Sequence, residues 1–212
     1  MPGKFHHEQI YRGDAVLQKL STTNIIIAGV GALGSNLADT LARQGAARLR
    51  LIDHDRVEEH NLGTQAYATS DIGQFKADAM KKHLFRIAGM EAESVRKELT
   101  ADNARVLLKD AGLVVDCFDN SAARQITQAH ARTARVPTLH AGLNTDYGEV
   151  VWDETYRVPR DVRGDVCDYP LARNLVLLTV STLAETILTW LTTGERKSWS
   201  LTLRDLAIRA IT

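Results

Sequence analysis

The stretch Gly29-Val30-Gly31-Ala32-Leu33-Gly34 directly follows an apolar, β-branched run at 24–28. A short run of this kind that ends at a glycine predicts a parallel strand buried on both faces. After the loop, leucines recur every four residues at positions 33, 37 and 41, and Gly45 follows, which predicts a helix with a glycine stop. A second short strand at 49–52 then completes a β-α-β unit around the glycine loop.

The three glycines of this loop each have a task in such a unit. Gly29 allows a tight turn, Gly31 leaves room for backbone to approach phosphates, and Gly34 permits close packing of helix on strand. The helix N-terminus presents free N–H groups and a positive dipole end to an anion. The pattern therefore predicts a nucleotide site, and the alternative is a structural turn that binds nothing.

Strands and helices continue to alternate along the chain. We expect a helix at about 74–87 capped by Asp71, a strand at 95–99, a short helix at 104–110, a strand at 113–117, a helix at 122–134 and a strand at 138–141. This alternation predicts an α/β fold with a doubly wound, mostly parallel, Rossmann-like sheet. Strands at 148–152 and 199–203, with a long helix between them, predict an antiparallel C-terminal extension, and residues 153–170 a mobile crossing loop.

Size and composition favour one domain over 1–212 that can bury a hydrophobic core. Lys and Arg total 26, as do Asp and Glu, so overall charge does not draw the protein to nucleic acid or anionic membrane. The apolar segment 175–191 contains several threonines and a glutamate, which suits a buried helix better than a membrane span. Two cysteines and an N-terminus without a signal-peptide pattern predict a reducing, cytoplasmic location.

An acidic segment follows the second strand. Asp53 ends this strand, where a carboxylate accepts hydrogen bonds from ribose hydroxyls. That feature alone is compatible with an NAD-dependent dehydrogenase. Asp55, Asn61 and Gln65 add more polar groups than a ribose needs, although Asp55 taken singly is also typical of a solvated loop.

Four motifs occur in the order and spacing of a known family. They are the glycine loop, Asp53-x-Asp55-x-Val57-Glu58-x-x-Asn61-Leu62-x-x-Gln65, Asp71-Ile72-Gly73-x-x-Lys76, and Asp116-Cys117-Phe118-Asp119-Asn120-x-x-x-Arg124. With them the chain resembles the ThiF/MoeB/HesA family, the bacterial relatives of ubiquitin-activating enzymes. The resemblance spans roughly 8–152 and continues loosely into the helix that contains Ala184 and Glu185.

The resemblance implies an ATP-dependent adenylyltransferase. Family members bind ATP and magnesium, and the C-terminal carboxylate of a small ubiquitin-like or sulfur-carrier protein ending in Gly-Gly attacks the α-phosphate. Pyrophosphate leaves and an acyl-adenylate remains. The enzyme must bring two anions together and stabilise charge on phosphate oxygens, so positioning and cations contribute most.

The matched positions imply a set of site residues. Asp53 would hold the ribose, Asn61 and Gln65 would line the phosphate site, Lys76 would reach the phosphates, Asp119 would hold magnesium, and Asn120 and Arg124 would shape the same pocket. Other interpretations remain for three of them: Lys76 as an exposed lysine of a basic helix, Asp119 as part of a turn, and Arg124 as a helix-surface residue.

The chain departs from the family at two cationic positions. Thr64 stands where relatives carry an arginine before the glutamine, and Glu8 stands where they carry an arginine that reaches the partner subunit's active site. Lys4 and Arg12 are the nearest substitutes for this second, N-terminal arginine. Loss of an arginine finger costs roughly 10³- to 10⁵-fold in phosphoryl transfer. The missing cations therefore come from another protein, or the active site is weakened.

The cysteines differ from the family's as well. Many relatives bind structural zinc through two Cys-x-x-Cys pairs, whereas this chain has only Cys167 in the comparable region, so no structural zinc is expected within one subunit. Cys167 is either a nucleophile that takes the acyl group as a thioester or an ordinary loop thiol. Cys117 is expected to be a buried strand residue.

The leading prediction is adenylation of a carrier protein by a dimer, with a homodimer as the default and a heterodimer with an arginine-bearing partner as the alternative. A second hypothesis is a non-catalytic nucleotide-binding scaffold subunit. A third is adenylation of a different acid or of a tRNA base. The dehydrogenase interpretation ranks below all three.

Overall fold

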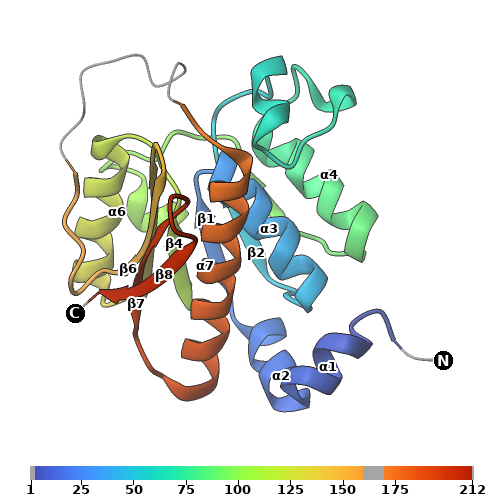
Figure 1. Cartoon of the computed structure of the whole chain (residues 1–212). Helices are drawn as coiled ribbons and strands as arrows, with labels where there is room; N and C mark the ends of the chain where they lie inside the picture. Colours follow the sequence, from blue (N-terminus) through green and yellow to red (C-terminus); the bar gives the residue numbers. More distant parts are fainter. Residues whose placement is uncertain (1–2, 160–169, 212) are drawn as a thin grey trace.

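The computed structural model describes residues 3–159 and 170–211, and one sheet of eight strands organises them (Figure 1). Its strand order is β3 (Glu93–Val95), β2 (Leu49–Ile52), β1 (Ile25–Ala28), β4 (Leu113–Asp116), β5 (Thr138–Asn144), β6 (Tyr147–Trp152), β7 (Ser198–Thr202) and β8 (Ala207–Ile211). The first five strands in this order run parallel, and β5 to β8 pair antiparallel. The predicted fold class is therefore confirmed.

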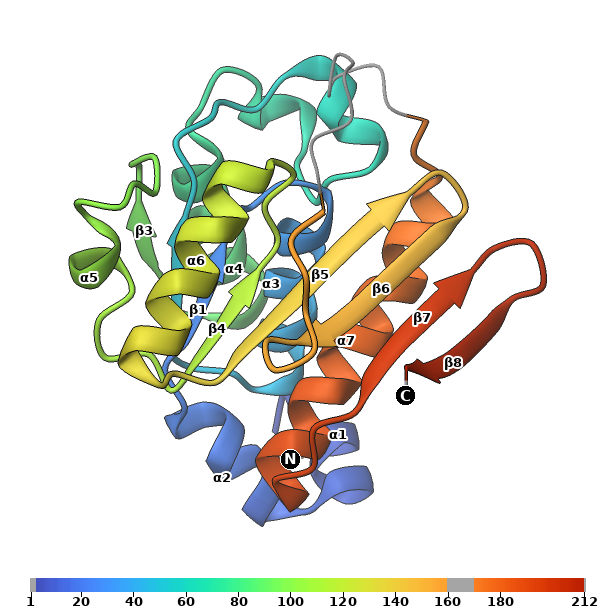
Figure 2. The same ribbon diagram turned by 90° about the vertical axis from the view of Figure 1, so that its left-hand side faces the viewer.

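Helices cover both faces of the sheet. They are α1 (His6–Arg12), α2 (Asp14–Thr22), α3 (Ala32–Gln44), α4 (Lys76–Ala88), α5 (Ala104–Leu107), α6 (Ser121–Ala134) and α7 (Arg173–Thr193), with 3₁₀ turns η1 (Glu59–Gly63) and η2 (Thr69–Asp71). Figure 2 shows α6 in front of the sheet and α7 behind it. Alternate residues of β1 serve the two faces: Ile25 and Ile27 join the core beneath α3, α4 and α7, and Ile26 joins the smaller core beneath α5 and α6.

Helix α3 forms as the leucine repeat predicts. Leu37 and Leu41 are fully buried against the sheet, and Gly45 ends the helix in the left-handed conformation, with φ of 107°. The N–H of Gly45 donates to the carbonyls of Ala42 and Leu41. Because α3 ends at Gln44, the chain can turn back and begin β2 at Leu49, and the acidic segment follows this strand.

Helix α7 is long and apolar enough to cross a membrane by length and composition, with a mean hydropathy of 1.6 over its best window. In the structure 56% of that window is buried, and the helix packs against α3 and β6. Its Trp190 ring lies 5.6 Å from that of Trp152 in β6. These contacts give α7 the place of a core helix, as its threonines suggested.

Several predicted details differ from the structure. Asp71 does not cap α4: it lies in η2 and accepts the N–H of Ala68 at 2.9 Å, and Phe75 occupies the N-cap position. The strand expected at 95–99 lies at Glu93–Val95. Helices α1 and α2 and strand β8 were not predicted. Most of the proposed crossing loop, 160–169, lies outside the described residues.

Candidate nucleotide site

The glycine loop connects β1 to α3, and two of its glycines are sterically required. Gly29 has φ of +90°, and a Cβ there would lie 3.0 Å from the carbonyl of Cys117. A Cβ on Gly34 would lie 1.9 Å from the carbonyl oxygen of Gly29, which no side chain tolerates. A Cβ on Gly31 would meet nothing within 4 Å. Position 31 therefore faces open space, as a residue beside a ligand would.

Asp53 ties the loop to the end of β2. One of its carboxylate oxygens accepts the N–H of Val30 at 2.7 Å, and the other accepts the N–H of Asp55 at 2.8 Å. The side chain is nearly buried, and this burial raises the pKa of the carboxyl, although the charge of Lys76 acts in the opposite direction. Asp53 therefore fixes the loop as well as standing where a ribose carboxylate is expected.

Lys76 lies beside the carboxylates of Asp53 and Asp55 rather than in solvent. Its Nζ donates to Oδ2 of Asp55 at 3.0 Å, and its backbone N–H donates to the Asp55 carbonyl at 2.8 Å. Only 11% of the Lys76 side chain is exposed, whereas the Asp55 side chain is 53% exposed. Lys76 is thus not an exposed lysine of a basic helix. A nearly buried ammonium beside the glycine loop suits phosphate binding.

Tyr67 was not predicted to be a site residue, although an aromatic residue within a polar segment is a signal that could have identified it. Its hydroxyl donates to the carbonyl of Val30 at 2.7 Å and lies 3.3 Å from the carbonyl of Lys76. Burial raises the pKa of Tyr67 well above its ordinary value, so the hydroxyl keeps its proton. Tyr67 thereby links the glycine loop to the start of α4.

Asn61 and Gln65 shape the segment between β2 and α4. Asn61 is buried, and its Oδ1 accepts the N–H of Glu58 at 2.9 Å, which closes the first turn of η1. The N–H of Gln65 donates to the Asn61 carbonyl at 2.9 Å. Asn36 of α3 donates to the carbonyl of Thr64 at 2.8 Å. The segment is therefore fastened to α3, one turn beyond the glycine loop.

Asp119 and Asn120 follow β4, the strand next to β1. Ala28 pairs with Asp116, and the N–H of Cys117 donates to the Ala28 carbonyl at 2.8 Å, so the two strands end at the same edge. Asp119 is exposed at that edge. The Asn120 side chain accepts the N–H of Ala123 at 2.8 Å as the N-cap of α6. The turn thus brings Asp119 to the end of the sheet that carries the glycine loop.

Arg124 is buried inside the protein, so its interpretation as a helix-surface residue is wrong. Its guanidinium donates to the hydroxyl of Tyr156 and to the carbonyl of Ala141, both at 2.8 Å, and lies 3.7 Å from Asp116. Burial lowers the pKa of Arg124, but the charge of Asp116 and the interaction with Tyr156 together outweigh burial and raise it. Arg124 therefore belongs to a buried network beneath the Asp119 turn.

His140 completes this network. Its Nδ1 lies 2.7 Å from Oδ2 of Asp116, its Nε2 lies 3.3 Å from Oδ1 of Asp153, and its ring stacks on Tyr156 at 3.8 Å. The other Asp116 oxygen accepts the N–H of Phe118 at 3.0 Å. The network thus supports the turn that leads to Asp119, and none of the four sequence motifs contains His140.

The donor set at this edge fits a magnesium ion. Ligand atoms of Asp53, His54 and Asp55 lie within 4.8 Å of one another, and Asp119 is a further exposed carboxylate at the same edge. Magnesium prefers carboxylate oxygens, uses few protein ligands and retains waters. Asp55 and Asp119 are exposed, whereas Asp53 is buried and already accepts two backbone N–H groups. Asp55 and Asp119 are therefore the carboxylates of this set that an ion can reach.

The two cations nearest the family's missing arginines have partners within the chain. Lys4 donates to the carbonyl of Ala88. Arg12 binds Glu185 through both terminal nitrogens, at 3.0 and 2.8 Å, and its Nε binds Glu8. Cys117 is buried, and burial raises the pKa of its thiol. Cys167 lies outside the described residues, so its role stays a prediction.

Comparison with solved structures supports the fold. The crystal structure of E. coli MccB with MccA-N7isoASN aligns with 99% of this chain and 72% of that chain, at a TM-score of 0.84 and 17% identity. The crystal structure of PaaA aligns with 97% of this chain and 68% of that chain, at a TM-score of 0.77 and 21% identity. At these identities the likeness concerns the fold alone.

Curated relatives are similar over the part that contains the site. The sulfur carrier protein ThiS adenylyltransferase of Bacillus subtilis is 30% identical, over 70% of this chain and 46% of the relative. The sulfur carrier protein adenylyltransferase of Thermus thermophilus is 30% identical, over 69% of this chain and 56% of the relative. The chain thus spans about half the length of these relatives. The model of the ThiF family matches residues 6–158, and the chain belongs to that family.

Proposed function

We propose that this protein uses ATP to adenylate the C-terminal carboxylate of a small ubiquitin-like or sulfur-carrier protein that ends in Gly-Gly. The observation that carries the proposal is the salt bridge beside the glycine loop in which Nζ of Lys76 lies 3.0 Å from Oδ2 of Asp55. Lys76 is nearly buried, and Asp53, two residues before Asp55, accepts the N–H of Val30 in the loop. A cation in this position supports binding of phosphates at the N-terminus of α3. The names of the two sulfur-carrier adenylyltransferases support the substrate class.

The reaction requires that a negatively charged carboxylate approach a negatively charged phosphate. In the proposed reaction the carrier carboxylate attacks the α-phosphate, and the bond to the departing pyrophosphate breaks. Lys76 supplies charge to the phosphate oxygens, and the loop amides at the start of α3 hold them. Asp53 accepts hydrogen bonds from the ribose. Asp55 and Asp119 would hold magnesium, which when bound adds positive charge to the phosphates.

Assembly and location follow the same proposal. We propose a cytoplasmic dimer, with a homodimer as the default. Because Arg12 and Lys4 already have partners within the chain, a heterodimer whose second subunit supplies an arginine is the alternative.

Two other functions have a specific observation in their favour. Thr64 and Glu8 at positions where the family has arginine favour a scaffold subunit that binds nucleotide without turning it over. A different acceptor is favoured by tRNA threonylcarbamoyladenosine dehydratase 2 of Saccharomyces cerevisiae, which is 29% identical over 52% of this chain and 26% of the relative.

An isotope exchange assay between ATP and pyrophosphate tests the proposal. With a purified carrier ending in Gly-Gly, the protein should support exchange, and Lys76→Ala should lower kcat/KM about 100-fold or more, since a lost charge donor costs 10² to 10³. Lys82→Ala is the matched control, because Lys82 lies on the same helix but is exposed. Nucleotide binding without exchange under every carrier offered would overturn the proposal in favour of the scaffold.

A further inference from the structure

A second polar pocket lies beside the glycine loop, on the other side of Tyr67. It has a volume of about 330 Å³ and opens between α3, α4, the segment around Gln65 and the first residue of α7. Its polar walls include Asn36, Gln65, His83, Arg86 and Arg173. The family motifs contribute only Leu62 and Gln65 to this pocket, and they include neither of its arginines.

Two guanidiniums in this pocket lack a carboxylate partner among the described residues. Arg86 Nη2 lies 3.1 Å from Nδ1 of His83, and Arg173 Nη1 lies 3.5 Å from the carbonyl of Gly63. Both side chains are exposed, and exposed Arg105 likewise has no carboxylate partner among the described residues, so the distinctive feature is that two such arginines line one pocket. Two guanidinium forks without carboxylate partners in one pocket indicate an anionic ligand, since each fork matches phosphate or carboxylate oxygens.

The single carboxylate of the pocket, Asp39, does not neutralise these arginines. One of its oxygens binds Nε2 of His83 at 2.7 Å, and the other binds Nε of Arg43 at 2.8 Å. Burial raises the pKa of Asp39, but these hydrogen bonds outweigh burial and keep it below its ordinary value. Because Arg86 can only donate to Nδ1 of His83, Nε2 carries the proton and donates to Asp39. The chain Asp39–His83–Arg86 thus orients the Arg86 guanidinium.

Gln65 lines the same pocket and has one unsatisfied polar atom. Its Oε1 is inaccessible to solvent and has no hydrogen-bond partner among the described residues. Because an atom without solvent access does not face the pocket, Arg86 and Arg173 are the groups that a ligand there would meet.

The pocket is connected to the candidate nucleotide site. The Tyr67 ring lines the pocket, and its hydroxyl donates to the Val30 carbonyl in the glycine loop at 2.7 Å. Asn36, another wall of the pocket, lies little more than one helical turn from the start of α3. A ligand in the pocket would therefore lie about one side chain away from phosphates on the loop.

We propose that this pocket binds a diphosphate group through Arg86 and Arg173. The proposal rests on the proposed function for the source of the ligand, which is either the terminal phosphates of ATP or free pyrophosphate. Two guanidiniums suit a group with two charged phosphates better than a single carboxylate, which one fork would satisfy. Arg86 and Arg173 would then supply positive charge near the segment where Thr64 replaces the family's arginine.

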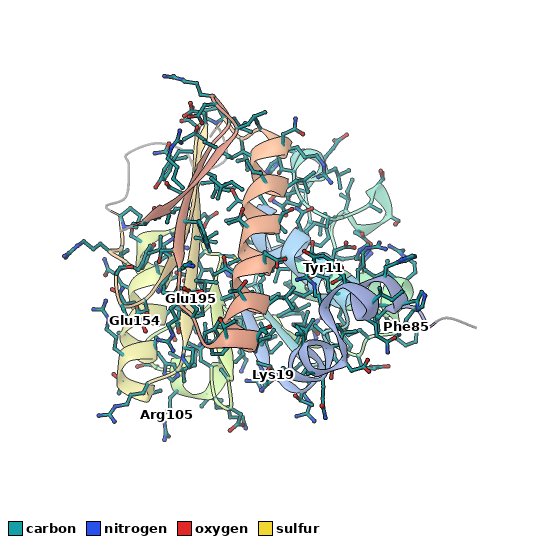
Figure 3. The ribbon with its side chains drawn as sticks, turned by 60° about the horizontal axis from the view of Figure 1, so that its bottom comes forward. Tyr11, Lys19, Phe85, Arg105, Glu154 and Glu195 are labelled. Atoms are coloured by element: carbon teal, nitrogen blue, oxygen red, sulfur yellow. The ribbon has the colours of Figure 1, made fainter. Side chains whose placement is uncertain are left out.

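The test measures binding of inorganic pyrophosphate by isothermal titration calorimetry at constant ionic strength. Arg86→Gln and Arg173→Gln should each weaken binding roughly tenfold, the effect of losing one charged hydrogen-bonding group. Arg105→Gln is the matched control. Figure 3 shows Arg105 on the opposite side of the molecule from Phe85, the neighbour of Arg86 in α4. Circular dichroism melting checks that each variant is folded.

Titrations with ATP and AMP identify the source of the diphosphate. If Arg173→Gln weakens binding of ATP and pyrophosphate but not of AMP, the pocket takes the terminal phosphates of ATP. If it weakens only pyrophosphate binding, the pocket takes free pyrophosphate. Unchanged pyrophosphate binding in the double variant, or an equal loss in Arg105→Gln, overturns the inference.

The result can be separated from the test of the proposed function. Exchange that depends on Lys76, together with pyrophosphate binding indifferent to both pocket arginines, would leave the adenylation proposal standing and remove the diphosphate pocket. Absence of exchange, together with pyrophosphate binding that depends on Arg86 and Arg173, would remove the adenylation proposal and leave the diphosphate pocket standing.

Discussion

The imidazole of His140 lies 2.7 Å from the carboxylate of Asp116, and both side chains are fully buried. The second ring nitrogen faces Asp153 at 3.3 Å, so both nitrogens point at carboxylates. Since an ionised carboxylate only accepts hydrogen bonds, both contacts are complete when each ring nitrogen carries a proton, that is, when the ring is an imidazolium. Asp116 in turn accepts the N–H of Phe118, so this buried charge pair fixes the turn that leads to Asp119.

We predict that His140→Gln destabilises the protein by about 3 kcal/mol, because removing one partner of a buried ion pair leaves an uncompensated charge. Urea unfolding followed by circular dichroism measures the change. His130→Gln is the control: His130 is a partly exposed histidine of α6 that does not belong to the network, and its replacement should change stability by less than about 0.5 kcal/mol. Similar losses for the two variants would contradict the network's role.

The same network predicts a pH dependence. Burial lowers the pKa of His140, but hydrogen bonds to Asp116 and Asp153 outweigh burial and raise it above its ordinary value. Its stabilisation is therefore complete below about pH 6.5, the value in the unfolded chain, and is lost as pH rises through the higher folded value. The urea midpoint of the wild type should fall between pH 6 and 9 by more than that of His140→Gln. Parallel pH profiles would refute the assignment.

Asp153 makes the stability of the fold depend on pH in the acid range as well. Burial raises its pKa, but hydrogen bonds from His140, Gln128 and Arg132 outweigh burial and keep the pKa below its ordinary value. A lowered carboxylate pKa stabilises the fold above the unfolded value of about 3.9, and this contribution is lost as pH falls through the folded value. Asp153→Asn should therefore remove part of the acid sensitivity below pH 4, as measured by urea unfolding at pH 3 and pH 5.

The glycine loop offers a matched pair of substitutions. Gly34→Ala should lower stability by more than about 4 kcal/mol or prevent folding, since its Cβ would lie 1.9 Å from the Gly29 carbonyl oxygen. Gly31→Ala should change stability by less than about 1 kcal/mol, because its Cβ meets nothing, and should weaken ATP binding. Thermal melting and calorimetric titration with ATP measure the two effects. Tight ATP binding by Gly31→Ala would show that nucleotide does not approach this position.

Asp119 allows the magnesium assignment to be tested without disturbing the fold. Asp119→Asn should raise the magnesium concentration needed for half-maximal exchange by at least about tenfold, because a neutral amide is a weaker ligand than a carboxylate. Its melting temperature should stay unchanged, since the side chain is exposed. Asp102→Asn, an exposed aspartate elsewhere, is the control. An unchanged magnesium requirement would remove Asp119 from the site.

The sequence was most informative where local patterns coincide with burial. The strand at 49–52 was predicted with the bounds that the structure has, because every residue of it is buried. Helices α1 and α2 were missed because among their residues only Leu20 is buried, which leaves little apolar periodicity. Strand β8 was missed because it lies at the sheet edge with mostly exposed residues. Elements that bury little leave little pattern.

Site residues show the same division. The tasks of Gly29 and Gly34 follow from their neighbours in sequence, and the structure agrees with them. The positions of Arg124 and His140 depend on partners in other strands and helices, such as Tyr156 and Asp153. No spacing along the chain indicates such pairs, because tertiary contacts alone bring them together.

The contact between position 34 and the Gly29 carbonyl also determines how the loop can respond to a ligand. Where two backbone segments touch with no side chain between them, the loop cannot shift toward the helix, and Asp53 holds its other side. Binding there costs little ordering entropy, because the receiving amides are already fixed. Amide hydrogen exchange at Val30–Ser35 should accordingly be slow before ATP is added as well as after it. Closure around substrate, where it occurs, then belongs to other segments of the chain.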